Sequence, residues 1–292
     1  MASTLFVQPG SGLDPVVEAM REAKKSIDLV IFRLTEREIE HELEMAVARG
    51  VKVRALVAHS AAGDDVRLRK VEQRLLAVGV LVGRTADDFA KYHGKYLIVD
   101  EAVYVLGFNF TQANVEARSF GIRTTNRRAL QDATRLFEAD LTRQSLSFDR
   151  LSPLVVSPET SRKALGRFIA GAKNTLAIYD GRLDDPDFIA LLLQREAAGV
   201  KIRVIGSAPK LVDAIPVREL KGMKLHVRAM VRDGTQVFLG SQSLRPLELD
   251  RRREVGLILA HRATARILLV VFDTDWEQAS TRKLDELEAQ LA

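Results

Sequence analysis

The sequence repeats itself, and this repeat restricts the folds that the chain can adopt. Residues 8–54 align with residues 157–203, which lie 149 positions later. Both copies have the pattern of a helix, a strand, a second helix and a second strand. Gly50 and Gly199 follow the second helix of their copies, where a left-handed residue is commonly needed. The repeat therefore predicts two domains of the same α/β type.

The first copy also shows where its elements begin and end. Residues 26–32, "SIDLVIF", favour a strand, and the helical segment that follows begins at Thr35, which we expect to cap it. The alternating "VKVRALV" that comes next predicts another strand.

The repeat continues in the stretch that holds the unusual polar residues. Residues 93–111 align with residues 226–244 at a smaller offset of 133, so the first copy has 16 more residues before this point. We expect these residues to form an additional helix over 64–79. Pro and Ser in 147–154 indicate a linker, which predicts domains at 1–148 and 149–292.

Both copies of the later stretch place a histidine and a cation two residues apart in an apolar run. Alternate residues of a strand face the same side, so each histidine and its cation project together. The aspartate that follows suits the turn of a hairpin and has a structural role there. The first copy has His93, Lys95 and Asp100, and the second has His226, Arg228 and Asp233.

This set of side chains suits cleavage of a phosphodiester without a metal ion. That reaction needs a neutral nucleophile, an acid for the leaving oxygen and fixed positive charge near the phosphoryl oxygens. Two imidazoles and two long cations, one pair from each half, supply these groups. Each half alone lacks a complete set, which explains why the chain needs two copies.

The paired His-x-Lys/Arg-x4-Asp pattern, followed by a glycine, resembles the phospholipase D superfamily over nearly the whole chain. The resemblance is strongest to its cardiolipin-synthase-like and nuclease-like bacterial branches. It implies two α/β/α sandwich domains related by a pseudo-two-fold axis, with one site between them. It also implies a phosphohistidine intermediate, with His93 as nucleophile and His226 as acid and base. The reverse assignment of the two histidines stays open.

The chain departs from the family pattern at three places. Arg228 replaces the usual lysine, and arginine does not superimpose on an ammonium group. The Gly-Ser-x-Asn segment is altered in both copies, and we expect Asn109, Ser241 and Ser243 to contact the phosphate there. The acid that orients an imidazole is present as Glu254 but is replaced by Ser119 in the first copy. This asymmetry suits either two histidines with different tasks or an impaired enzyme.

Composition limits the compartment and the cofactors. The chain has a net charge of +5, which favours anionic partners, and no cysteine, which excludes thiolate metal sites. We expect no cofactor, no metal and no stable protein partner. Neither a signal peptide nor a transmembrane segment is apparent, so a cytoplasmic protein is expected.

The substrate is the least determined part of the hypothesis. We favour hydrolysis or transfer of a phosphatidyl group. A nuclease is the first alternative, because a basic chain suits a phosphate backbone, although aromatic residues make up only 6% of the sequence. A phosphate-binding protein without activity is the second. His41, His59 and His261 are expected outside the site.

Overall fold

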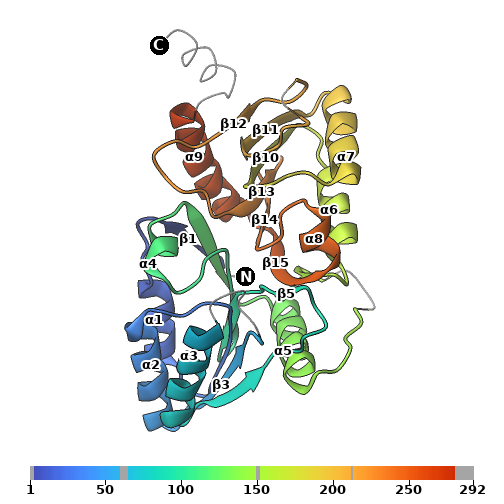
Figure 1. Cartoon of the computed structure of the whole chain (residues 1–292). Helices are drawn as coiled ribbons and strands as arrows, with labels where there is room; N and C mark the ends of the chain where they lie inside the picture. Colours follow the sequence, from blue (N-terminus) through green and yellow to red (C-terminus); the bar gives the residue numbers. More distant parts are fainter. Residues whose placement is uncertain (1–2, 60–64, 149–151, 212, 280–292) are drawn as a thin grey trace.

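The protein has two mixed α/β halves (Figure 1). The computed structural model describes residues 3–59, 65–148, 152–211 and 213–279. The first half contains, in chain order, β1 (Ser3–Gln8), α1 (Asp14–Glu22), β2 (Ser26–Ile31), α2 (Arg37–Ala48), β3 (Lys52–Val57), α3 (Asp65–Ala77), β4 (Leu81–Arg84), β5 (Lys91–Tyr92), β6 (Tyr96–Val99), β7 (Ala102–Leu106), α4 (Gln112–Val115), β8 (Ser119–Thr124) and α5 (Arg127–Thr142). The second half contains β9 (Leu154–Ser157), α6 (Ser161–Ala170), β10 (Thr175–Asp180), α7 (Pro186–Ala197), β11 (Lys201–Gly206), β12 (Val217–Arg218), β13 (Arg228–Arg232), β14 (Gln236–Gly240), α8 (Pro246–Asp250), β15 (Arg252–Ala260) and α9 (Arg262–Gln278).

The two sheets repeat one strand order. The first sheet runs β1-β8-β7-β6-β2-β3-β4. The second runs β12-β11-β10-β13-β14-β15-β5, with β9 also paired to β15. In both, two parallel strands (β2 and β3, or β10 and β11) lie beside an antiparallel hairpin. The predicted α/β repeat is therefore confirmed.

The predicted helix over 64–79 is confirmed as α3. In the second half the described residues between Gly206 and Val217 contain no helix, so α3 accounts for the longer first copy. The predicted boundary at 148/149 adjoins residues 149–151, which lie outside the described residues, and it stays a prediction.

Local sequence signals explain some of the helix ends. Asp185 caps α7, because its carboxylate accepts hydrogen bonds from the backbone N–H groups of Asp187 and Phe188. The predicted cap at Thr35 is wrong. Glu36 is the N-cap residue of α2, and the Thr35 hydroxyl donates instead to the carbonyl of Phe110. Gly50 and Gly199 have φ values of +82° and +88°, as expected for residues that end helices.

Three hydrophobic cores stack through the molecule. One lies between the first sheet and α1, α2 and α3, and another lies between the second sheet and α6 and α7. The central core contains residues of both halves, including α5 and α9. Alternate strand residues face different cores: Leu29 contributes to the first core and Val30 to the central one. The shared central core holds the two halves together.

Strand residues also cross between the halves, near the middle of the molecule (Figure 1). β5 pairs in parallel with β15 of the second half, with Lys91 opposite Arg252. In the reciprocal contact, Arg118 of the first half forms a parallel bridge with Leu225. Each crossing lies immediately beside one of the two histidine segments.

Candidate active site

The two motif aspartates lie in the hairpin turns, away from the histidines. Asp100 and Asp233 both have a φ of +50°, and each carboxylate accepts hydrogen bonds from three consecutive backbone N–H groups at the start of a neighbouring strand. These bonds lower the pKa of both carboxyl groups, although burial acts in the opposite direction. The predicted structural role of the aspartates agrees with this geometry.

His93 is fixed from both ends by the other half of the chain. Its backbone N–H donates to the carbonyl oxygen of Arg253 at 2.8 Å. Its Nδ1 lies 3.0 Å from Glu254 Oε2, and Glu254 is fully buried. A carboxylate at Nδ1 retains the proton there and leaves the lone pair on Nε2. The orienting acid of the first histidine thus comes from the second repeat.

Lys95 lies on the opposite side of the His93 ring. Its Nζ is 3.1 Å from His93 Nε2 and donates to the His93 carbonyl at 2.8 Å. Burial is the main cause that lowers the pKa of Lys95 to about 7, and the charge of Arg228 adds to it. The Nε2 lone pair and the ammonium group therefore face the same small region.

His226 has the same backbone anchor but lacks the acid. Its N–H donates to the carbonyl of Arg118 at 2.9 Å. Its Nδ1 is buried and has no hydrogen-bond partner among the described residues. Ser119, aligned with Glu254, is fully buried, and its hydroxyl lies 3.5 Å from the carbonyl of Asn114.

The electrostatics place both histidines in one site. Burial, followed by the charges of Lys95 and Arg228, lowers the pKa of His93 well below its usual value. The same causes in the same order lower the pKa of His226 to about 2, and His93 contributes as well. Each imidazole thus lies within range of cations from both halves, and both are neutral near pH 7 in the free protein.

Arg228 lies near two buried acids, Asp180 and Glu248, that no sequence motif indicates. Its Nε donates to Ser243 Oγ at 2.9 Å, and its Nη2 lies 4.0 Å from Glu248. Asp180 stands opposite Arg228 in the β10–β13 pair, and burial raises the pKa of this aspartate to about 6. The second cation is therefore held by side chains, whereas Lys95 contacts only its own histidine among the described hydrogen-bond partners.

The altered Gly-Ser-x-Asn segments adopt matching positions in the two halves. The N–H of Asn109 donates to Asn114 at 2.8 Å, and the N–H of Ser243 donates to Glu248 at 2.7 Å. Asn109 and Ser243 thus occupy equivalent positions in the structure, although the alignment of Gly107 with Gly240 would pair Asn109 with Gln242. The Asn109 Oδ1 atom is buried and lacks a hydrogen-bond partner within the described ranges.

Ser241 contacts the strand that bears Glu254. Its hydroxyl lies within hydrogen-bond distance of both the N–H and the carbonyl of Val255. A hydrogen bond from Ser241 also lowers the pKa of Glu254, whereas burial, the largest effect, raises it. These contacts assign Ser241 to the support of Glu254, and its predicted contact with phosphate stays a prediction.

Two crossed ion pairs lock the segments that anchor the histidines. Arg253 of β15 lies 3.1 Å from Asp140 of α5, and Arg118, just before β8, lies 2.7 Å from Asp275 of α9. Each aspartate also accepts a hydrogen bond from a tyrosine hydroxyl at 2.6 Å, Tyr92 or Tyr179. We call these two pairs the crossed arginine pairs. Each arginine joins the two halves and presents its carbonyl to one histidine.

The alignment of the repeat contained a signal for these pairs. Residues 118–122 align with 253–257, and 136–141 align with 271–276, both at an offset of 135. The two arginines therefore occupy matching positions, and so do the two aspartates. The alignment does not show that each arginine pairs with the aspartate of the opposite half. Glu248 occupies the place that Asn114 has in the first half, and this counterpart is not an acid, so the repeat provided no signal for it.

The remaining histidines lie outside this cluster. His41 is exposed on α2, and His261 caps α9 through its ring nitrogen. His59 is exposed on a loop and lines a pocket of about 120 Å³ together with Thr85 and Lys91. Within the described ranges, no group of three or more acidic or histidine side chains is arranged to hold a metal ion.

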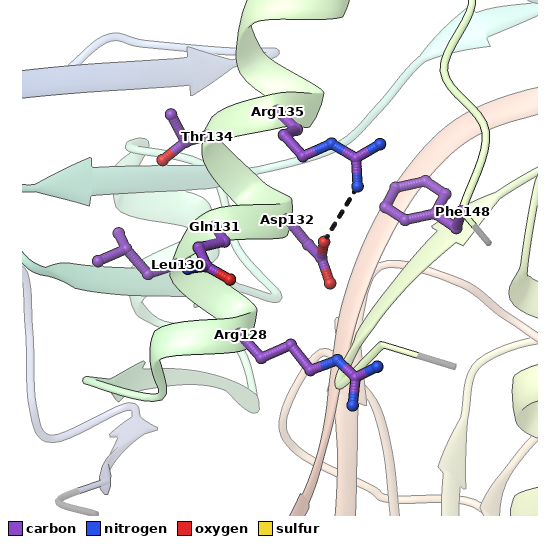
Figure 2. Close-up of a pocket in the computed structure, with 7 residues that line it drawn as sticks. All are labelled: Arg128, Leu130, Gln131, Asp132, Thr134, Arg135 and Phe148. Carbon is purple, nitrogen blue, oxygen red and sulfur yellow. Dashed lines mark ion pairs between the residues drawn. The ribbon is translucent and has the colours of Figure 1, made fainter. Parts of the chain in front are cut away.

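A larger cavity lies elsewhere. A pocket of about 760 Å³ lies along α5, and Arg128, Asp132 and Arg135 line it on the side that faces Phe148 (Figure 2). Asp132 and Arg135 form an ion pair of 3.6 Å there. None of the predicted site residues lines this pocket.

Comparison with known proteins agrees with the architecture. Residues 16–141 match the family model described as "Cardiolipin synthase, PLD-like domain". The fold is similar to polyphosphate kinase from Porphyromonas gingivalis, with a TM-score of 0.76 and 21% identity over 94% of this chain and 50% of that one. It is also similar to phosphatidylserine synthase from Haemophilus influenzae Rd KW20, with a TM-score of 0.72 and 11% identity over 94% of this chain and 85% of that one.

This chain thus spans half the length of the polyphosphate kinase. No curated protein matches the sequence. The identities are low enough that the two solved structures demonstrate a shared fold and nothing finer. The family model thus identifies a PLD-like domain over residues 16–141, and the two solved structures show that the fold of the chain as a whole is similar to theirs.

Proposed function

We propose that the protein cleaves phosphodiesters, or transfers their phosphoryl-linked group to an alcohol, through a phosphohistidine on His93. The observation that carries this proposal is the pair of contacts on one ring, with Glu254 at Nδ1 and Lys95 at Nε2. The carboxylate fixes the tautomer that leaves Nε2 nucleophilic, and the ammonium group lies where a phosphoryl oxygen would need positive charge.

In the first step, His93 Nε2 forms a bond to phosphorus and the bond from phosphorus to the leaving oxygen breaks. His226 donates a proton to that oxygen. In the second step, His226 removes a proton from water or an alcohol, whose oxygen attacks phosphorus and displaces His93. Lys95 and Arg228 bind the phosphoryl oxygens in both steps.

The lowered pKa values suit this division of tasks. A neutral His93 is the nucleophilic form. His226 must be protonated to act as an acid, and the charges of Lys95 and Arg228 oppose this in the free protein. A bound phosphate neutralises both cations and thereby raises the pKa of His226, so that substrate binding itself prepares the acid.

The sequence favours a phosphatidyl group as the substrate class, with nucleic acid as the alternative. The described part of the chain has no helix that is long and apolar enough to cross a membrane. Both substrate classes contain the phosphodiester that the proposed chemistry requires.

The test compares turnover of bis-p-nitrophenyl phosphate, phosphatidylglycerol vesicles and single-stranded DNA, with and without a chelator. We expect hydrolysis of the first compound in the presence of chelator, because Lys95 and Arg228 supply the positive charge. Wild-type protein that is folded but inactive on all three would contradict the proposal and would favour a phosphate-binding protein without activity.

A further inference from the structure

Each histidine is preceded by a second cation that the family motif does not include. Lys91 lies two residues before His93, and Lys224 lies two residues before His226. Both halves therefore have the order Lys-x-His-x-Lys/Arg. Lys91 begins strand β5, His93 directly follows it, and both side chains contact the ring of Phe32.

Lys91 lies at the edge of the site and forms no ion pair with the described residues. Its Nζ lies 4.4 Å from the centroid of the Phe32 ring, and that ring packs edge-on against His93 with 5.2 Å between centroids. No carboxylate lies within 4 Å of this ammonium group in the parts of the chain that the structure describes. Burial and the charges of Arg252 and Arg33 lower the pKa of Lys91, whereas the more weakly acting Glu254 and Glu248 oppose this shift.

Lys224 occupies the matching place in the second half. It is exposed, and its carbonyl accepts a hydrogen bond from Arg118 at 2.9 Å, which fixes the backbone beside the crossing. Its charge contributes to the lowered pKa of His226. Among the described residues Lys224 also has no ion-pair partner. The pseudo-two-fold relation thus places beside each histidine one lysine that has no ion-pair partner among the described residues.

We propose that Lys91 and Lys224 form two outer anion subsites that bind the phosphates on either side of the scissile one, so that the substrate is a single-stranded nucleic acid. This rests on the proposed function and reverses the preference for a phosphatidyl group. Phosphatidylglycerol has one phosphate, which Lys95 and Arg228 suffice to bind. A nucleic-acid strand presents further phosphates on both sides, and these would neutralise the outer lysines.

The test measures binding of a fluorescein-labelled oligothymidylate to the full chain with His93→Ala, which prevents turnover, at several NaCl concentrations. Each lost phosphate contact lowers the slope of log affinity against log salt by about 0.7 for a single strand, so Lys91→Gln/Lys224→Gln should lower it by about 1.4. Each single variant should lose half of that, and Lys91→Arg/Lys224→Arg should restore the wild-type slope.

Lys52→Gln/Lys201→Gln is the matched control, because it removes the same charge from equivalent exposed positions. Lys52 and Lys201 begin β3 and β11, and the site lies beyond the opposite ends of these strands. The control should retain the wild-type slope. Equal slopes in the control and the Lys91/Lys224 variant would overturn the proposal. They would show that the slope depends on the net charge of the protein and not on the position of these two lysines.

A kinetic comparison separates this proposal from the proposed function. With His93 intact, Lys91→Gln/Lys224→Gln should lose more kcat/KM on the oligonucleotide than on bis-p-nitrophenyl phosphate, which has a single phosphate. A larger loss on phosphatidylglycerol vesicles than on the oligonucleotide would overturn the nucleic-acid subsites. Wild-type protein that shows the expected salt slopes but hydrolyses neither compound would retain the subsites and contradict the proposed function.

Discussion

His93 and His226 occupy equivalent positions in the two halves, yet they face different partners. Both backbone N–H groups donate to an arginine carbonyl of the opposite half. Beyond that carbonyl, His93 meets Glu254 at Nδ1, whereas the Nδ1 of His226 is buried without a partner among the described residues. One scaffold therefore holds two imidazoles with different proton chemistry, and a single residue pair, Glu254 and Ser119, makes the difference.

This comparison indicates how the two halves of a repeated fold can take different chemical roles. The backbone anchors and the crossed arginine pairs are shared, so they set the position of the two rings. The carboxylate is present once, so it fixes the tautomer of one ring only. A nucleophile needs a fixed lone pair, whereas an acid and base needs to exchange its proton.

The largest expected effect separates the two histidines directly. His93→Ala should abolish turnover, because the covalent step has no other nucleophile. His226→Ala should lower turnover by about 10²–10⁴-fold, the usual contribution of a general acid. Steady-state assays on bis-p-nitrophenyl phosphate measure both, and circular dichroism checks that each variant is folded. Equal residual rates in the two variants would remove the proposed division of tasks.

The crossed arginine pairs should dominate the stability of the domain interface. Arg253→Met leaves Asp140 buried without its partner and should lower the free energy of unfolding by about 3–5 kcal/mol. Arg118→Met should cost somewhat less, because Arg253 also binds Glu159 at 2.5 Å and its side chain is 4% exposed against 12% for Arg118.

Urea unfolding measures these changes, with Arg182→Met as the control. Arg182 pairs with Asp184 at the surface, where an ion pair contributes about 1 kcal/mol or less. If Arg253→Met cost no more than this control, the interface would not depend on the crossed pairs.

The residue pair that differs between the halves should show unequal effects on rate. Glu254→Gln should lower kcat about 10–100-fold, by analogy with the carboxylates that orient histidines at metal sites. Ser119→Ala should change kcat much less, since the Ser119 hydroxyl hydrogen-bonds only to a backbone carbonyl among the residues that the structure describes. Comparable losses in both variants would indicate that His226 has a partner equivalent to Glu254.

The smallest expected effect concerns pH and distinguishes the two cations. The pKa of Lys95 is lowered to about 7, so its charge is present below pH 7 and is lost as the pH rises through that value. Since a charged Lys95 binds the phosphoryl group, kcat/KM should decline above pH 7. Lys95→Arg should remove this decline, because arginine stays protonated, although it should also lower the maximal rate. A profile that is flat from pH 6 to 9 in the wild type would contradict this role for Lys95.

The sequence predicted much of the fold because the repeat was strong. Helix α3 and the two hairpins followed from offsets and apolar periodicity. Strand β5 did not, since two residues that join the other sheet leave no periodic pattern of their own. The cap at Thr35 failed because α2 begins one residue later than expected: Leu34 pairs with Phe110, and the N–H of Thr35 donates to the carbonyl of that distant residue.

The site was predictable in its composition but not in its pairing. The two histidines, their cations and Glu254 were all expected, because the motif recurs at equivalent positions. That Glu254 serves the histidine of the other half was not predictable, since an alignment of repeats does not show which half faces which. The acids around Arg228, namely Asp180 and Glu248, were missed because neither has a charged counterpart in the first repeat.

Mapping the covalent intermediate tests the central claim most directly. The His226→Ala variant is mixed with bis-p-nitrophenyl phosphate, quenched in base and digested, and the modified peptide is sequenced by mass spectrometry. We predict a p-nitrophenyl phosphoryl group on His93, released slowly because the base for the second step is missing. The adduct on any other residue, or turnover without an adduct, would contradict the assignment of His93 as the nucleophile.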